Sequence, residues 1–147
     1  MSVRDCMYCE DGEKIKSLMT PIADLRVSRL HLLLDQSFPG RCVLALNEHH
    51  NEVDELTEKQ RTDFFTDLAD AVAAIRTVFK PDKVNYAIFG DQVTHFHMHL
   101  VPKYKNGALW GKPYCAEAVP EAKLSAAETA KRVEDIRAAL KKGRTQK

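Results

Sequence analysis

Hydrophobic and polar residues alternate most regularly over residues 94–102, which read T-H-F-H-M-H-L-V-P. A period of two is typical of a β-strand whose two faces differ. The alternation therefore predicts a strand with one apolar face on a core and one histidine face toward a cleft or a neighbouring layer. The histidines are His95, His97 and His99, and the apolar residues between and after them are Phe96, Met98 and Leu100.

Two further apolar runs predict a β-hairpin. Residues 27–35 and the shorter run of residues 42–46 are typical of buried strands, and a Pro-Gly pair between them favours a turn. His31, within the first run, has no partner motif and is interpreted as a structural residue. Residues 84–89 predict another strand, which we expect to pair antiparallel with the histidine strand.

Two capped helices are predicted on either side of the histidine strand. Thr57 and Gln60 fit a capping box, and apolar residues then recur at three- and four-residue steps until Pro81 ends the run. Ser125 and Glu128 open the second helix in the same way. The apolar stripe of the first helix is interpreted as core packing rather than as a cofactor platform.

The order of these elements favours an α+β fold. Strands and helices occur in blocks rather than in strict alternation, which predicts an antiparallel sheet with helices on one face rather than a Rossmann-like layout. Residues 103–120 hold glycines, prolines and the only tryptophan, and are expected to form an irregular loop. We expect a single domain over residues 1–147, in which residues 103–147 form a C-terminal loop and helix extension.

Composition and charge narrow the classes of partner. The chain has 147 residues, 44% hydrophobic and 29% charged, with a formal net charge of +1. The 22 basic and 21 acidic residues nearly cancel, so we expect no nucleic-acid or membrane-surface partner, while a small anionic ligand remains compatible. No apolar run approaches the roughly 20 residues needed to span a bilayer, and the N-terminal segment is polar. We therefore expect a cytoplasmic protein.

Cys6 and Cys9 form a C-x2-C pair, the spacing with which two thiolates share one tetrahedral zinc ion. In a reducing compartment structural disulfides are rare, so metal binding or burial explains the cysteines better. Thioredoxin-type redox chemistry is a competitor, but that motif opens a helix after a strand, and no strand is expected before Cys6. If zinc is bound, histidines supply the missing ligands, with His49, His50 and His95 as candidates. The alternative is a pair of unligated thiols.

The alternating histidines suit phosphoryl chemistry better than a single metal site. Residues four apart on a strand are separated by roughly 13 Å, so the outer two imidazoles cannot close on one ion. Neutral imidazole is a nucleophile near pH 7, and its attack on phosphorus would give a covalent phosphohistidine. The central His97 is best placed for that role, with one neighbour free to serve the phosphate and the other a metal. The alternative is that they are ordinary polar residues on an exposed sheet face.

The stretch of residues 95–101 resembles the H-φ-H-φ-H-φ-φ motif of the histidine-triad (HIT) superfamily of nucleotide hydrolases and transferases. That superfamily includes dinucleoside polyphosphate hydrolases and nucleoside phosphoramidases. The resemblance runs from Cys6 to about Trp110 and includes G-R-C-V-L-A-L, the histidines at 49 and 50, the long helix and V-P-K-Y-K after the triad. The chain looks like the bacterial, zinc-binding branch with a C-x2-C knuckle.

The resemblance implies a HIT-like antiparallel five-stranded sheet with a long central helix, an additional C-terminal helix and assembly into a homodimer. It implies that His97 is the nucleophile on the α-phosphorus and that His99 hydrogen-bonds the phosphate or the leaving group. Asp35 stands where the family often has an acidic group on the ribose hydroxyls, and Trp110 where a C-terminal loop reaches a pocket. Asp91 replaces the asparagine or glutamine of some relatives and is assigned no role.

The resemblance also implies one zinc ion per chain, held by Cys6, Cys9, His49 and His95. His49 is chosen over His50 because L-N-E-H followed by E-V-x-E-L fits the pattern of this branch. Four protein ligands leave no position for water, so this zinc would be structural rather than catalytic.

These expectations combine into a nucleotide hydrolase or transferase that cleaves a nucleoside 5′-phosphoryl bond through a nucleotidyl-His97 intermediate. The substrate would be a dinucleoside polyphosphate or a nucleoside phosphoramidate. One alternative is a nucleotide-binding regulatory module with little turnover. Another is an enzyme whose metal is catalytic and is chelated by His95 and His97. The sequence does not determine the leaving group, the preferred base, or whether the reaction is hydrolysis or transfer.

Overall fold

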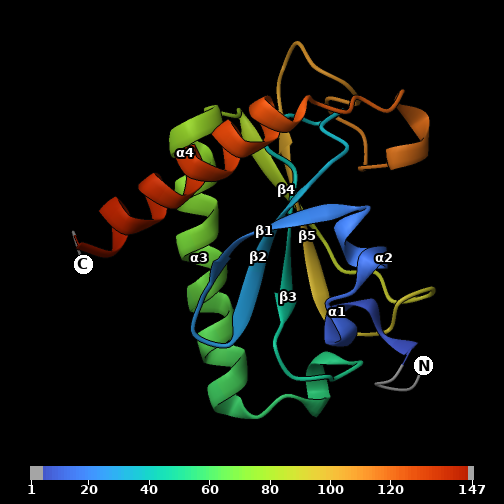
Figure 1. Cartoon of the computed structure of the whole chain (residues 1–147), viewed down its shortest axis with the longest axis vertical. Coiled ribbons are helices and arrows are strands. Elements are labelled where there is room, and N and C mark those ends of the chain that lie inside the picture. The colour runs from blue at the N-terminus through green and yellow to red at the C-terminus, as the bar shows by residue number, and fades with distance from the viewer. Residues whose placement is uncertain (1–4, 146–147) are drawn as a thin grey trace.

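One antiparallel sheet organises the structure, a computed structural model that describes residues 5–145. Within these residues, five strands lie in the order β1-β2-β3-β5-β4 (Figure 1). Their bounds are β1 (Met19–Asp24), β2 (Ser28–Leu33), β3 (Cys42–Leu46), β4 (Lys83–Ala87) and β5 (His97–Lys103). The strands at the two edges of the sheet are therefore β1 and β4.

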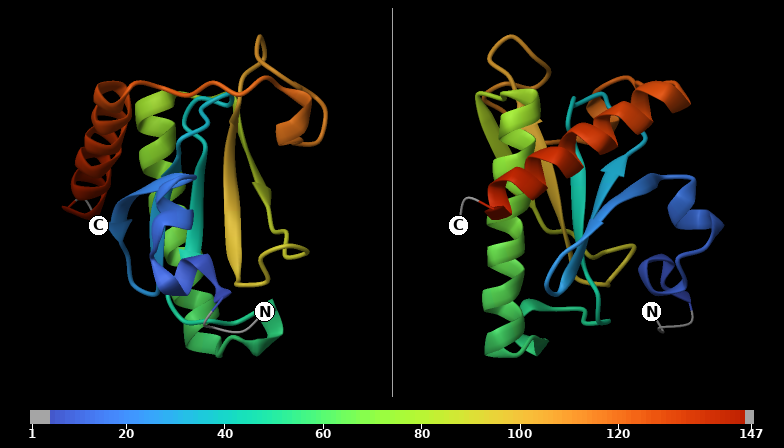
Figure 2. Two further views of the ribbon diagram at one scale, coloured as in Figure 1. Left: turned by 45° about the vertical axis from the view of Figure 1, so that its right-hand side comes forward. Right: turned by 60° about the vertical axis from the view of Figure 1, so that its left-hand side comes forward.

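Helices cover both faces of the sheet unequally. The right-hand view of Figure 2 shows the long α3 on one side of the sheet and the short α1 and α2 on the other. The helices are α1 (Met7–Glu10), α2 (Glu13–Lys16), η2 (Val53–Glu55), α3 (Glu58–Phe79), η3 (Ala116–Ala118) and α4 (Ala126–Thr145). Side chains of α3 and α4 share the main core with alternate residues of the strands. The α+β fold, with its antiparallel sheet, long central helix and C-terminal helix, is thus confirmed, but the expectation of helices on one face is wrong, since α1 and α2 pack on the other.

The helix starts follow the predicted capping. Thr57 accepts a hydrogen bond from the Gln60 backbone N–H, and the Gln60 side chain accepts one from the Thr57 backbone N–H. Ser125 and Glu128 exchange the same pair of bonds at the start of α4. Each pair satisfies two amide groups that a helix N-terminus leaves without a partner.

The predicted hairpin and strand pairing are confirmed, but one strand was missed, and the bounds of β2, β4 and β5 differ from expectation. β2 pairs antiparallel with β3, and β4 with β5. β1 was not predicted as a separate strand, since Pro21 interrupts its pattern; an edge strand with a register shift after Pro21 tolerates the missing donor. β5 begins at His97 rather than Thr94, because the Phe96 N–H donates to the His50 carbonyl instead of continuing the strand.

The turn between β2 and β3 requires glycine at residue 40. Gly40 has a φ of +90°, which L side chains rarely adopt. A Cβ at this position would lie 2.8 Å from the Phe79 ring at the end of α3. The turn is therefore held tightly against the helix end, and it delivers Arg41 to the start of β3 on the face that carries the strand histidines.

A buried carboxylate connects α3 to the turn between β1 and β2. Asp67 is fully buried. It accepts hydrogen bonds from the backbone N–H groups of Arg26 and Val27, the Arg26 guanidinium and the Ser28 hydroxyl, at 2.7 to 3.1 Å. Because every donor comes from one short segment, this single side chain fixes how the turn sits on the helix.

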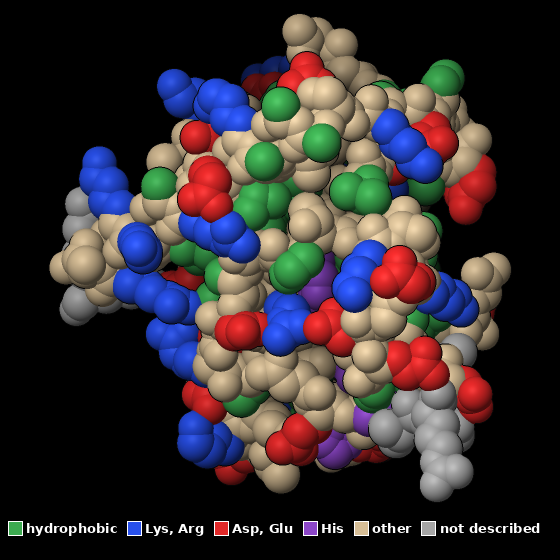
Figure 3. Space-filling model, viewed as in Figure 1, with side chains coloured by type: hydrophobic (Ala, Val, Ile, Leu, Met, Phe, Trp, Pro, Cys, Tyr) green, Lys and Arg blue, Asp and Glu red, His purple; other side chains and the backbone are tan. Residues whose placement is uncertain are grey.

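Acidic and basic side chains are mixed over most of the face that Figure 3 shows. A group of basic side chains stands out at the left, where α4 ends (Figure 3); Lys142 and Arg144 lie in its last turn. Among residues 5–145, no helix is long and apolar enough to cross a membrane.

Candidate active site and metal centre

β5 presents its histidines as the alternation predicted. Phe96, Met98 and Leu100 belong to the main core. His97 and His99 lie on the opposite face, in register with Ala45 and Val43 of β3. Val43 and Ala45 pack with side chains of the N-terminal helices, and both imidazoles line a cavity beside this packing.

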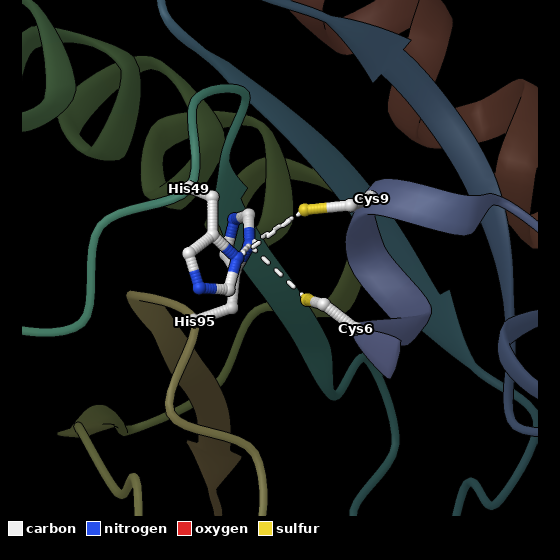
Figure 4. Close-up of side chains that lie close together, drawn as sticks. All are labelled: Cys6, Cys9, His49 and His95. Carbon is white, nitrogen blue, oxygen red and sulfur yellow. Dashed lines mark hydrogen bonds between the residues drawn. The ribbon is translucent and has the colours of Figure 1, made fainter. Parts of the chain in front are cut away.

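Four possible ligand atoms converge where the N-terminal segment meets the start of β5. The ligand atoms of Cys6, Cys9, His49 and His95 all lie within 4.8 Å of one another (Figure 4). The Nδ1 atoms of the two histidines are 3.2 Å apart, and three sulfur–Nδ1 distances are 3.3 to 3.5 Å. Four ligands placed tetrahedrally around zinc are separated by roughly 3.3 to 3.8 Å. The cluster is therefore suited to hold one zinc ion.

Hydrogen bonding prepares His95 to act as a ligand. Its Nε2 lies 2.7 Å from the Leu46 carbonyl oxygen, which can only accept, so the ring proton must be on Nε2. The lone pair is then on Nδ1, the atom that faces the thiols. Second-sphere partners of this kind commonly orient metal-binding histidines.

The electrostatics of the two thiols also favour a bound cation. Burial, together with the adjacent Cys6, raises the pKa of Cys9 to about 11, because a thiolate there would lack a compensating charge. A divalent ion between the sulfurs would supply that charge. His50 lies outside the cluster, near the Gln60 side chain amide and the Glu48 carboxylate.

His97 is held in a single tautomer by the backbone of the adjacent cluster. Its Nδ1 donates to the His95 carbonyl oxygen at 2.6 Å, so the lone pair lies on Nε2. Burial lowers the pKa of His97, and the hydrogen bond to the carbonyl only partly opposes this. The Tyr8 ring, from within the C-x2-C pair, packs at 5.0 Å from His97 and 5.2 Å from His95. The result is a neutral imidazole whose position is set from two sides.

An open cavity of about 840 Å³ adjoins His97 and His99. This volume lies within the range of small-molecule sites. Its walls come from α1, α2, the adjoining ends of β1 and β2, the turn before β3, the loop of residues 89–93, and the segment of residues 114–117. The side chains that matter below are Tyr8, Arg41, Phe89, Asp91, His97, His99, Tyr114 and Glu117.

His99 is enclosed by aromatic rings. Its ring centroid is 5.3 Å from that of His97, 5.7 Å from that of Phe89 and 6.2 Å from that of Tyr114, on which it stacks. Burial, with smaller contributions from His97 and Arg41, lowers the pKa of His99 to about 3. His99 is therefore a neutral hydrogen-bonding group at ordinary pH.

The structure does not bring Asp35 or Trp110 to the cavity wall. Asp35 accepts hydrogen bonds from the Ser37 and Ala122 backbone N–H groups, each at 3.0 Å. Its other oxygen lies 3.7 Å from Arg41 Nη1. Trp110 is 41% exposed. Asp35 thus holds the segment that precedes α4 and lies near Arg41, which lines the cavity. Trp110 lies on the surface.

Sequence reasoning missed three lining side chains: Tyr8, Arg41 and Tyr114. The period of two offered a signal for Arg41, since it precedes Val43 by two residues on the histidine face of β3. Tyr8 lies inside the C-x2-C pair, so it could have been placed wherever that pair was placed. The position of Tyr114 depends on the path of an irregular loop and left no local signal.

The C-terminal loop (residues 104–115) is fastened by polar contacts to its own backbone and to the β2–β3 turn. The Nζ of Lys103, a residue only 3% exposed, donates to the carbonyls of Leu109 and Lys112 at 2.6 and 3.0 Å. The Tyr104 hydroxyl donates to the Pro39 carbonyl at 2.8 Å. These bonds hold the loop beside the turn that carries Arg41.

Comparison with known proteins relates this chain to one family. A family model described as the HIT domain matches residues 27–106, more than half of the chain. Among solved structures, a histidine triad protein from Bradyrhizobium japonicum is 22% identical, with a TM-score of 0.79 over 88% of this chain and 96% of its own. No curated protein sequence matches the chain.

Two further solved structures share the fold at lower identity. A Zn-bound histidine triad family protein from Mycobacterium smegmatis is 15% identical, with a TM-score of 0.72 over 99% of this chain and 100% of its own. A diadenosine triphosphate hydrolase from Plasmodium falciparum, in complex with cyclomarin A, is 14% identical, with a TM-score of 0.61 over 83% and 76%. At these identities the likeness concerns the fold.

Proposed function

The chain belongs to the HIT domain family, and from that membership and the geometry of the site we propose that it is a nucleotide hydrolase or transferase. It would cleave a nucleoside 5′-phosphoryl bond in a dinucleoside polyphosphate or a nucleoside phosphoramidate. The observation that carries the proposal is the 2.6 Å hydrogen bond from His97 Nδ1 to the His95 carbonyl, which leaves the Nε2 lone pair available beside the cavity.

In the proposed reaction, His97 Nε2 attacks the α-phosphorus. The new N–P bond forms as the bond to the leaving group breaks, and the leaving group takes the electron pair. The imidazole becomes positively charged, and its Nδ1–H stays bonded to the His95 carbonyl, which stabilises that charge. Attack by water then breaks the N–P bond and restores His97, while another acceptor in place of water gives transfer.

His99 serves the phosphate or the leaving group in this proposal. It is next to His97 on the same face of β5, and its Nδ1 is buried without a hydrogen-bond partner. Asp35 acts on the substrate through Arg41, which it approaches and which lines the cavity. For Trp110 we propose contact with a part of the substrate that extends beyond the cavity.

Zinc is assigned a structural role. Cys6, Cys9, His49 and His95 fit one ion, and the structurally similar Mycobacterium smegmatis protein is Zn-bound. When bound, the ion would neutralise the two thiolates and join the N-terminal segment to the start of β5. A catalytic ion chelated by His95 and His97 is disfavoured, because the only free lone pair of His95 lies on Nδ1, which faces the thiols of Cys6 and Cys9.

The remaining parts of the proposal concern the whole chain. We assign one domain to residues 1–147, with residues 103–147 as an extension. A homodimer is supported by the edge position of β4 together with the exposed side chains of Tyr86, Ile88 and Phe89. A cytoplasmic location is supported by the free thiols, since a zinc-binding pair must stay reduced.

The test is intact-protein mass spectrometry and product analysis with diadenosine triphosphate and adenosine 5′-phosphoramidate. The wild-type chain should form an adenylyl adduct and release AMP. His97→Ala should form no adduct and lose at least about 1,000-fold in kcat, while keeping its zinc content. His50→Ala, outside the cluster and the cavity wall, is the matched control and should keep activity.

A second outcome would favour the nucleotide-binding regulatory module instead. In that case AMP binds tightly, neither substrate yields product or adduct, and His97→Ala changes only the affinity for nucleotide. Wild-type turnover by His97→Ala would contradict the covalent mechanism outright.

A further inference from the structure

The cavity wall contains a concentration of polar atoms without partners. Among residues 5–145, five buried side-chain nitrogen or oxygen atoms have no hydrogen-bond partner. Three of the five are Arg41 Nε, His99 Nδ1 and Tyr114 Oη, and all three residues line the same cavity. Buried polar groups are nearly always satisfied, so a cluster of exceptions points to a ligand that completes them.

These three side chains are contiguous and lead away from the nucleophile. The Arg41 guanidinium lies 4.9 Å from the centre of the Tyr114 ring, and that ring stacks on His99 at 6.2 Å and 29°. His99 in turn is 5.3 Å from His97. The contacts therefore run from His97 through His99 and Tyr114 to Arg41, away from the zinc cluster.

Arg41 is a buried cation with weak compensation. It is only 8% exposed, and its ion pair with Asp35 measures 3.7 Å. A charge-assisted N–H···O bond is typically about 2.7 to 2.9 Å. That carboxylate already accepts two backbone hydrogen bonds and one from the Ser37 hydroxyl, and the other acid whose charge interacts with Arg41, Glu117, is exposed to solvent. A buried charge with so little compensation costs free energy unless another anion approaches it.

The chemistry of the group identifies the missing partner. A guanidinium, a phenol and a neutral imidazole are all hydrogen-bond donors, and phosphate oxygens accept several donors at once. Burial raises the pKa of Tyr114, so its hydroxyl remains protonated. The carboxylates of Asp91 and Glu117 also line the cavity, but both residues are exposed, whereas Arg41 is buried. Water therefore screens the two acids more strongly than it screens the buried cation.

We propose that Arg41, Tyr114 and His99 form a subsite for the phosphoryl group next to the one attacked by His97, and that this subsite selects substrates with an anionic phosphate leaving group. This inference rests on the proposed function and decides between its two substrate classes in favour of dinucleoside polyphosphates. The bond from the α-phosphorus to the bridging oxygen breaks, and its electron pair stays on that oxygen. Arg41 neutralises the charge that develops there.

An amine leaving group would make a different demand. Departure of an amine requires a proton, and His99, with its pKa lowered to about 3, does not carry one to spare near neutral pH. A phosphate ester departs as an anion without a proton, since its second pKa is about 6. The site is thus better equipped to stabilise negative charge than to protonate an amine.

The first test compares kcat/KM for diadenosine triphosphate and adenosine 5′-phosphoramidate, which share the adenylyl group. Arg41→Met should lower the value for the polyphosphate by about 100-fold and that for the phosphoramidate by less than about 5-fold. Tyr114→Phe, which keeps the ring, should lower only the polyphosphate value, by about tenfold. Lys14→Met, an exposed cation on the same cavity wall, is the control and should leave the ratio unchanged.

An equal loss on both substrates would overturn the subsite, because it would show a role at the shared α-phosphate or in folding. Thermal unfolding of each variant separates the folding effect, and Tyr114→Phe keeps the test open if Arg41→Met does not fold.

The second test needs no turnover, so it separates failure of the subsite from failure of the proposed function. Calorimetric titration of the wild-type chain should show ADP binding at least about tenfold more tightly than AMP, since ADP adds the second phosphoryl group. Arg41→Met should remove the difference. Equal affinities in the wild-type chain would overturn the subsite even if the enzyme cleaves nucleotides, whereas a preference for ADP without any turnover would support it while the proposed reaction fails.

Discussion

His31 lies in one row with Val43 and His99 across three neighbouring strands, yet its surroundings make it a purely neutral residue. It is 3% exposed, and its Nδ1 has no partner. Burial, assisted by the nearby Arg29 charge, lowers its pKa to about 4. His31 therefore binds a proton at about pH 6.5 in the unfolded chain but only near pH 4 in the folded chain.

This difference predicts an acid-sensitive stability. As pH falls from about 6.5 to about 4, the unfolded state binds a proton that folded His31 refuses, so the free energy of unfolding decreases over that window. At pH 5 the loss from His31 is about 2 kcal/mol. Urea unfolding of the wild-type chain and of His31→Gln at pH 7.5 and 5.0 measures it. The variant should lose less stability than wild type, and identical losses would contradict the assignment.

The positions of residues near the histidine strand could be predicted where a sequence pattern is compatible with only one arrangement in space. The alternation of histidines with Phe96, Met98 and Leu100 predicted which face is core, and the C-x2-C pair with His49 and His95 is brought together as expected. Arg41 shares the period of two with Val43, but its contact with Tyr114 depends on a turn and an irregular loop that are far apart in the sequence. Asp35 and Trp110 were expected in the cavity wall by resemblance alone and lie outside it.

At the scale of elements, Asp67 holds α3 against the turn between β1 and β2. Asp67→Asn keeps the size of the side chain, but it removes the negative charge and replaces one of the two acceptor oxygens with an NH2 group. That group would face hydrogen-bond donors. We expect it to lower the free energy of unfolding by about 3 kcal/mol, the usual cost of leaving a buried charged network incomplete. Chemical denaturation monitored by circular dichroism measures this loss.

Asp63 offers a matched control on the same helix. Its ion pair with Lys59 is largely exposed on the Lys59 side, and exposed pairs contribute roughly 0 to 1 kcal/mol. Asp63→Asn should therefore change stability by less than about 1 kcal/mol. Similar losses in both variants would show that the helix, rather than the buried network, is responsible.

Elements with both a cap and a periodic interior were predicted well. α3, α4 and the β2–β3 hairpin have local start and stop signals, and each was found where the sequence indicated. β1 contains Pro21 and was missed, because its pairing with β2 is decided by the neighbouring strand rather than by its own residues. The late start of β5 likewise reflects a tertiary hydrogen bond to His50 that no periodicity reports.

For the whole molecule, the zinc cluster joins the N-terminal segment to the centre of the sheet. Removing the ion should free the segment that carries Tyr8 and lower the thermal midpoint by about 10 °C, since several kcal/mol of binding free energy are lost and each shifts the midpoint by roughly 2 to 4 °C. Activity should fall in parallel, because Tyr8 packs on His97. Metal analysis, thermal unfolding and turnover after chelation measure the three effects.

Cysteine variants provide the control for this prediction. Cys9→Ser should reproduce the effects of chelation, whereas Cys115→Ser, an exposed thiol outside the cluster, should leave the zinc content and the thermal midpoint unchanged. Loss of activity with an unchanged thermal midpoint would indicate a catalytic ion instead.

The hydrogen bond from His97 to the His95 carbonyl has a consequence for how this chain can change by mutation. The group that orients the nucleophile is main chain, so every residue type at position 95 presents the same acceptor. No single codon change can delete it, in contrast to the side-chain carboxylate that orients the histidine of a serine protease. A substitution of His95 would therefore remove a candidate zinc ligand but leave the backbone acceptor of His97 in place.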